Sequence, residues 1–157
     1  MKPEAGGPGR TGKLQLTRRP AADSDRAFVW HAYAEAYREV ATRQFDKWED
    51  GLQEAYFEEK WACNGFEIIE VDGVPEGAIW TTDEGAFLQV REVFLLPERR
   101  GQGIGSRLVR HELATARRAG KPLRLRVVKI SRAVALYERL GFTVCGETDT
   151  QYWMEAV

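Results

Sequence analysis

Alternating and helical spacings of apolar residues divide this chain into short strands and helices. Residues 13–19 alternate between apolar and polar positions and predict a strand, which two helices follow, the first of them with one apolar face. The pair Asp72-Gly73 lies between two apolar runs and predicts a β-hairpin. A long strand over about 86–96 should end at Pro97, because proline cannot donate to a sheet ladder.

The second half of the chain continues the same alternation of strands and helices. A helix is expected over about 103–119, and Gly120 should end it. A strand over 123–128, a short helix and two closing strands should follow. The predicted order is β-α-α-β-β-β-α-β-α-β-β, which favours an α/β fold with a mixed sheet and helices on both faces. Residues 1–12 are rich in Gly and Pro and predict a disordered tail before one domain over 13–157.

Composition narrows the class of protein. The chain has 157 residues, of which 43% are hydrophobic and 30% charged, as in an ordinary globular domain. Its net charge of −1 lacks the basic excess of nucleic-acid binders. It has neither a membrane-length apolar run nor a signal-peptide core, so we expect a cytoplasmic protein that binds neither nucleic acid nor membrane. Cys63 and Cys145 lie far apart, which predicts unpaired, partly buried thiols and no metal site.

The segment over residues 95–106 carries the strongest chemical signal. A strand ends there, a glycine-rich loop follows, and a helix begins. Glycines let main-chain N–H groups approach an anion, and the start of a helix adds free donors and a partial positive charge. Arg99 and Arg100 add formal positive charge beside it. The segment therefore suits a diphosphate.

Other interpretations of the same loop have to be weighed. The pattern Gly101-x-Gly103-x-x-Ser106 is close to a dinucleotide fingerprint, but it comes late in the chain and no acidic residue follows at the required distance. A P-loop needs a lysine where Ser106 follows Gly105. A glycine-rich turn without any ligand stays open from the loop alone.

Two separate segments resemble the GCN5-related N-acetyltransferase (GNAT) superfamily. Arg100-x-x-Gly103-x-Gly105 matches in full the Arg/Gln-x-x-Gly-x-Gly/Ala signature that follows the fourth strand in that family. Residues 133–142 read Ala-Val-Ala-Leu-Tyr-Glu-Arg-Leu-Gly-Phe and are similar to the closing segment of the family, in which a short helix carries a tyrosine and ends in Leu-Gly-Phe. One helix and one strand separate the two segments, as the family requires.

The resemblance implies an acyl-CoA N-acyltransferase fold and direct transfer of an acetyl group from acetyl-CoA to an amine. The pantetheine arm is then expected between splayed fourth and fifth strands, with the diphosphate on the glycine loop. Many relatives dimerise, so a homodimer is an open expectation. In many members an asparagine before the tyrosine helix contacts the cofactor, and only Ser131 can replace it here. The implied cofactor contacts are Val93, Phe94, Leu95, Arg99, Arg100, Gly101, Gln102, Gly103, Ile104, Gly105, Ser106, Ser131 and Tyr137.

Aminolysis of a thioester needs a base, an oxyanion donor and a partner for the leaving thiolate. An alkyl ammonium has an ordinary pKa of about 10.4, so a base must take its proton. Glu92 is the candidate, with a surface glutamate beside Arg91 and a water chain as open alternatives. The resemblance assigns the general-acid role to Tyr137, against a tyrosine that only packs on its helix. A main-chain N–H near residues 93–95 could donate a hydrogen bond to the oxyanion.

The acceptor pocket is expected between the first two helices and the third and fourth strands. Four aromatic candidates for substrate binding lie in these elements: Tyr33, Tyr37, Trp48 and Trp80. Core packing is the alternative for each of them. The sequence does not name the acceptor. A small-molecule amine is favoured, and a protein lysine or N-terminus, or a non-catalytic acyl-CoA-binding sensor domain, remain as alternatives.

Overall fold

The computed structural model describes residues 14–45 and 48–157, so the tail predicted over residues 1–12 lies outside the described range. Within that range the helices and strands follow the predicted order. They are β2 (Leu16–Pro20), α2 (Arg26–Phe45), α3 (Asp50–Trp61), β3 (Glu67–Val71), β4 (Val74–Asp83), β5 (Leu88–Leu95), α4 (Ile104–Arg118), β6 (Leu123–Val128), α5 (Ala133–Arg139), β7 (Thr143–Glu147) and β8 (Gln151–Ala156), with 3₁₀ turns at Asp23–Asp25 and Pro97–Arg99.

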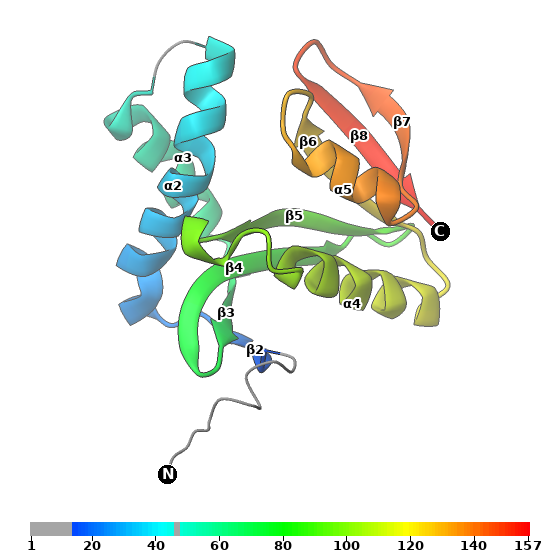
Figure 1. Ribbon diagram of the computed structural model, residues 1–157, viewed down its shortest axis with the longest axis horizontal. Coiled ribbons are helices and arrows are strands. Elements are labelled where there is room, and N and C mark those ends of the chain that lie inside the picture. The colour runs from blue at the N-terminus through cyan, green and yellow to red at the C-terminus, as the bar shows by residue number, and fades with distance from the viewer. Residues whose placement is uncertain (1–13, 46–47) are drawn as a thin grey trace.

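The strands form one mixed sheet in the order β2-β3-β4-β5-β6-β8-β7. The central neighbours β5 and β6 run parallel, joined by the crossover helix α4, and the other neighbours run antiparallel. Helices α2 and α3 pack on one face, while α4 and α5 pack on the other (Figure 1). The predicted α/β architecture is therefore confirmed.

The hairpin between β3 and β4 forms where the sequence predicts it. Asp72 and Gly73 have φ angles of 52° and 85°, so both lie in the left-handed region that a tight two-residue hairpin turn requires. The strand β4 begins at Val74, directly after this turn, and a bulge in the β3–β4 pairing lets it pass through Pro75.

A β-bulge at Arg91 reverses the alternation of side chains along β5. Trp80 of β4 pairs with Glu92, but the next residue, Thr81, pairs with Val90, so Arg91 is an additional residue in β5. Apolar residues before the bulge pack toward α4. After it, Glu92 contacts side chains of α2 and α3. The bulge thus turns a carboxylate toward the opposite face of the sheet.

The strands β5 and β6 separate just where this bulge occurs. Their pairing covers only residues 88–90 of β5 and 123–125 of β6. Beyond it, β6 continues its pairing with β8 as far as Val128, and in Figure 1 the β6–β8–β7 part of the sheet turns away from β5 together with α5. The splay implied by the resemblance is confirmed. In the described part of the chain, the side of β5 that faces β6 has no ladder partner after Val90.

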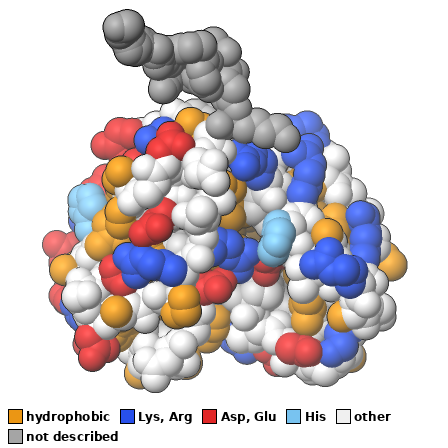
Figure 2. All heavy atoms as spheres, turned by 90° about the horizontal axis from the view of Figure 1, so that it is seen from below, with side chains coloured by type: hydrophobic (Ala, Val, Ile, Leu, Met, Phe, Trp, Pro, Cys, Tyr) orange, Lys and Arg blue, Asp and Glu red, His pale blue; other side chains and the backbone are white. Residues whose placement is uncertain are grey.

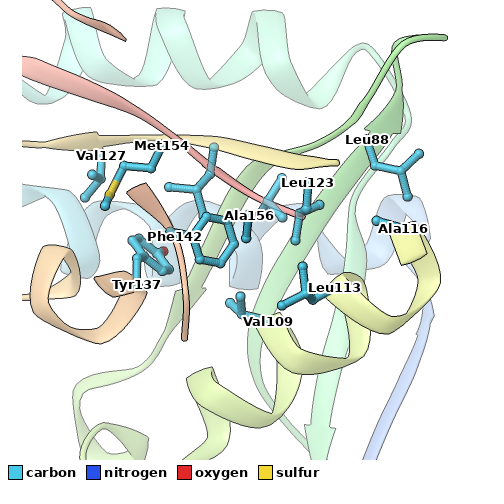
Figure 3. Packing of buried hydrophobic residues seen from close by; sticks show 12 residues of the cluster. Leu88, Val109, Leu113, Ala116, Leu123, Val127, Tyr137, Phe142, Met154 and Ala156 are labelled. Atoms are coloured by element: carbon cyan, nitrogen blue, oxygen red, sulfur yellow. The ribbon is translucent and has the colours of Figure 1, made fainter. Parts of the chain in front are cut away.

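The core beneath α4 and α5 holds the C-terminal half of the sheet together. Figure 3 shows Val109 and Leu113 of α4 in the same cluster as Tyr137 of α5, with Met154 of β8 beside them. The rings of Tyr137 and Phe142 lie 5.7 Å apart between centroids. The Leu-Gly-Phe segment therefore fixes the position of the tyrosine helix by packing.

Charged groups of both signs are interspersed on the surface shown in Figure 2. Cys63 and Cys145 are free but exposed, and not partly buried as expected. Cys63 follows the last turn of α3, and Cys145 lies on the edge strand β7, so neither reaches the core. Over the described ranges, none of the helices has the length and apolar character needed to cross a membrane.

Candidate active site

Glu92 is a buried carboxylate at the point where β5 leaves β6, with only 8% of its surface exposed. Its Oε1 accepts a hydrogen bond from the Tyr37 hydroxyl at 2.6 Å, and its Oε2 accepts one from Lys60 Nζ at 2.7 Å. Removing a carboxylate from water costs several kcal/mol unless such partners are present. The alternative of a surface glutamate beside Arg91 is therefore wrong.

The partner Lys60 comes from α3 and completes what we call the Glu92 cluster: Glu92, Lys60, Tyr33 and Tyr37. Lys60 Nζ lies 3.2 Å from the Tyr33 hydroxyl, 5.0 Å from the centroid of the Tyr33 ring and 5.9 Å from that of Tyr37. Burial lowers the pKa of Lys60, but the Glu92 carboxylate outweighs it, and the pKa is raised overall. Lys60 could not be recognised from the sequence, because a lysine on a helix usually faces water.

Two tyrosines on different elements respond to the charge of Glu92. Burial, and then that charge, raises the pKa of Tyr37 well above its ordinary value and the pKa of Tyr137 to about 12. Tyr137 is 7% exposed, and its hydroxyl has no hydrogen-bond partner in the described ranges. The Tyr137 hydroxyl therefore lies close enough to Glu92 for the carboxylate charge to raise its pKa.

Three of the four predicted substrate-binding aromatics lie around this cluster. Tyr33 and Tyr37 belong to it, and Trp80 pairs with Glu92 across the strands and packs on Phe66 with ring centroids 5.5 Å apart. Trp48 does not join them. The Arg38 guanidinium lies over the Trp48 ring, 5.4 Å from the ring centroid.

The glycine loop leaves main-chain donors free at the start of α4. Gly101 and Gly103 have φ angles of 76° and 80°, which other residues adopt only with strain. The first amide of this helix with an acceptor is that of Arg107, which donates to the Gly103 carbonyl at 3.1 Å. The amides of residues 101–106 have no acceptor among the described groups. Such amides, together with the helix dipole, form a site for an anion.

The two arginines before this loop have different surroundings. Arg99 Nε donates to Glu76 at 3.0 Å, and its Nη1 donates to the Gln102 side chain at 3.4 Å. Gln102 in turn donates to the Glu98 carbonyl at 3.1 Å. The side chains of Arg99 and Gln102 therefore hold the loop against β4, whereas Arg100 is exposed and is the better placed of the two arginines for an anion.

Several predicted cofactor contacts can be made only through the main chain. The side chains of Val93 and Leu95 pack with Ile104 beneath α4, and the Phe94 side chain packs with the aromatic residues beneath α2. Because these side chains belong to the core, they leave only the backbone of β5 and of the first α4 turn for a ligand.

Ser131 and Gly105 connect the starts of α4 and α5. The Ser131 hydroxyl oxygen accepts a hydrogen bond from the Ala133 amide at 3.1 Å, which supports the first turn of α5. A side chain at Gly105 would meet Leu136 of α5 at 3.8 Å, an ordinary contact distance. Ser106 is half-buried in the first turn of α4. The loop and the tyrosine helix are therefore adjacent.

An open pocket of about 520 Å³ lies between α2 and the glycine loop. Its lining mixes both signs of charge. It consists of Glu35, Arg38, Glu39, Thr42 and Arg43 of α2 with Pro97 and Arg100 of the loop.

A parallel pair that splays at a bulge, followed by a glycine loop at a helix start, defines an acyl-CoA N-acyltransferase fold. The chain belongs to the acetyltransferase (GNAT) domain family, which matches residues 62–144, more than half of its length. The fold is shared with the PaiA N-acetyltransferase of Thermoplasma acidophilum, solved with coenzyme A, at a TM-score of 0.73 and 17% identity over 90% of this chain and 98% of that one.

Two curated relatives have a higher sequence identity to this chain, over a shorter stretch of it. An uncharacterized N-acetyltransferase of Methanocaldococcus jannaschii is 29% identical over 126 residues, which are 65% of this chain and 51% of that protein. The thialysine N-epsilon-acetyltransferase of Bos taurus is 32% identical over 104 residues, 59% of each chain. The match thus spans between half and three fifths of these relatives.

Proposed function

We propose that this protein binds acetyl-CoA and transfers its acetyl group directly to a primary amine of a small molecule. One observation supports this most: a buried carboxylate, Glu92, and a buried tyrosine, Tyr137, lie within electrostatic reach of each other where β5 and β6 separate. A base and a proton donor on either side of one gap are what aminolysis of a thioester requires.

The cofactor is proposed to bind along the gap and the loop. Its diphosphate would accept hydrogen bonds from the amides of residues 101–106, with Arg100 adding charge. Its pantetheine arm would pair with the edge of β5 that lacks a ladder partner. Solved relatives of the same fold support this, since one contains coenzyme A and another, from Salmonella typhimurium, acetyl-CoA.

Glu92 is proposed as the base that takes the proton of the acceptor ammonium. Tyr37 donates to one carboxylate oxygen and fixes its orientation, and the second oxygen already accepts from an ammonium. The rings of Tyr33 and Tyr37 suit a cation before its deprotonation, because aromatic faces attract ammonium groups. The neutral amine can then attack the thioester carbonyl.

Tyr137 is proposed to stabilise the leaving thiolate. With a pKa of about 12, its hydroxyl keeps its proton at neutral pH and can donate. A thiol ordinarily has a pKa of about 8.5, so the tyrosine shares its proton in a hydrogen bond rather than giving it up completely. Its lack of another partner in the described residues leaves the hydroxyl free for this contact.

The surroundings of Glu92 favour a small amine over a basic peptide. The cluster is largely aromatic, and the lining of the nearby pocket has more arginines than glutamates, unlike the acidic groove that would suit a basic peptide. One relative is named for the Nε amine of thialysine, and a structure 27% identical over 58% of this chain, with a TM-score of 0.51, is a nourseothricin acetyltransferase. A protein acceptor is the second candidate.

A thiol-release assay with acetyl-CoA tests this proposal. The panel should contain diamines, lysine-like amino acids, aminoglycosides and basic peptides. We expect release with small primary amines and little with peptides. Release with peptides alone would favour the second candidate, and no release with any amine, despite measured cofactor binding, would favour a non-catalytic acyl-CoA sensor.

A further inference from the structure

We infer that Lys60 is itself an acetyl acceptor, so that the protein acetylates its own Lys60 Nζ from acetyl-CoA. This inference rests on the proposed function, because it needs the same cofactor and the same base. It adds a modification site on a helix outside the two sequence segments that carry the resemblance.

The position of Lys60 Nζ is the first argument. A general base must lie within about 2.6–3.2 Å of the atom from which it takes a proton. Lys60 Nζ lies 2.7 Å from Glu92 Oε2 and 3.2 Å from the Tyr33 hydroxyl. It therefore lies at the distance from the base that the nitrogen of an external acceptor would also have to reach, and it is likewise a primary alkyl amine.

The surroundings of two other lysines show how unusual this position is. Lys121 and Lys129 are also ion-paired, with Asp83 at 2.8 Å and Glu147 at 2.6 Å. Their carboxylate partners are 60% and 58% exposed, whereas the partner of Lys60 is 8% exposed. The three lysines are similarly accessible, with side chains 34%, 26% and 26% exposed. Lys60 alone of these three meets a buried base.

The reaction uses only groups already introduced. Lys60 gives one ammonium proton to Glu92, and its nitrogen lone pair attacks the thioester carbonyl, so that a C–N bond forms. The tetrahedral adduct then breaks its C–S bond. The thiolate leaves with the bonding electrons, stabilised by the Tyr137 hydroxyl, and takes up the second proton that the nitrogen loses. The products are N-acetyl-Lys60 and coenzyme A, and Glu92 returns its proton to solvent.

The modification would change the site in which it occurs. An acetylated Lys60 carries no charge, so Glu92 keeps only the hydrogen bond from Tyr37. The added acyl group also fills space beside Tyr33. The acetylated protein is therefore expected to turn over external amines more slowly than the unmodified protein.

The test is to incubate the purified protein with acetyl-CoA and no other amine, and to follow its intact mass and its peptides. We expect a gain of one acetyl group at Lys60 with first-order kinetics independent of protein concentration, while Lys121 and Lys129 stay unmodified. Glu92→Gln should lower the initial rate at least about 10²-fold. Lys60→Arg, which keeps the positive charge, should abolish the gain at this position.

A failure of this inference can be distinguished from a failure of the proposed function. If the same preparation releases thiol with an added amine but Lys60 stays unmodified, the inference is overturned and the proposed function stands. Labelling of Lys60 no faster than of Lys121 and Lys129, or equally fast in Glu92→Gln, would show chemical acetylation and would also overturn it. Bound cofactor with neither thiol release nor labelling would contradict both.

Discussion

Replacing Glu92 with glutamine is expected to lower turnover by about 10²–10⁴-fold, the range found when a general base is removed. Glutamine has nearly the same shape and its carbonyl oxygen can still accept the hydrogen bond of Tyr37, but it cannot take a proton from an ammonium. Lys60 loses its carboxylate partner, and as its side chain is 34% exposed it can turn to water. Steady-state kinetics and calorimetric titration should show the loss in kcat with the affinity for acetyl-CoA unchanged.

Glu112→Gln is the matched control for this variant. Glu112 is equally buried, at 5% exposed, and pairs with Arg18 of β2 rather than with any group of the Glu92 cluster. The control should lower the melting temperature, because it leaves the half-buried Arg18 guanidinium with Glu67 as its one charged partner, while turnover per folded molecule stays at the parent level. If Glu92→Gln retains full turnover, Glu92 is not the base.

Tyr137→Phe is expected to lower turnover by up to about 10²–10⁴-fold, with little change in the affinity for acetyl-CoA. The ring packs against Phe142 and the cluster beneath α4, and phenylalanine preserves that packing. Only the hydroxyl is lost, and no described protein group depends on it. The effect should therefore fall on kcat and not on the melting temperature.

Tyr152→Phe provides the control for Tyr137. Tyr152 of β8 packs on the same cluster but lies beside Lys129 instead of Glu92. We expect its kinetics to match those of the parent protein. Equal turnover in Tyr137→Phe and the parent would remove this hydroxyl from the mechanism and leave the thiolate to be stabilised by water.

The order of elements could be predicted because each depends on local pattern. Apolar spacing, Asp72-Gly73 and the glycines that end helices act within a few residues, so the sequence is enough to recognise them. The glycine loop and the Leu-Gly-Phe segment were also readable, because their residue types are set by backbone conformation. Gly101, Gly103 and Gly141 all have φ angles between 76° and 99°.

The site was only partly predictable because its contacts join distant parts of the chain. Lys60 and Glu92 are far apart in sequence, and nothing in the polar face of α3 distinguishes this lysine from one in water. The arginines of the loop look equivalent in sequence, but Glu76 engages only Arg99. The bulge at Arg91 had a weak signal: apolar positions change phase between Val90 and Val93.

These findings share one physical basis. The bulge that rotates Glu92 toward α2 and α3 lies where the pairing of β5 with β6 ends, so a single irregularity positions both the proposed base and the gap. Beyond that gap, we propose that the free amides at the start of α4 determine whether a cofactor binds at all.

Calorimetric titration of the protein with acetyl-CoA and with S-acetyl-pantetheine tests this last claim most directly. Both ligands carry the thioester and the pantetheine chain, but only acetyl-CoA carries the nucleotide with the diphosphate that the amides of residues 101–106 should bind. Each hydrogen bond to a charged group is worth about 1.5–3 kcal/mol, so we predict that acetyl-CoA binds at least about 100-fold more tightly. Equal affinities, or no heat with acetyl-CoA, would contradict the account.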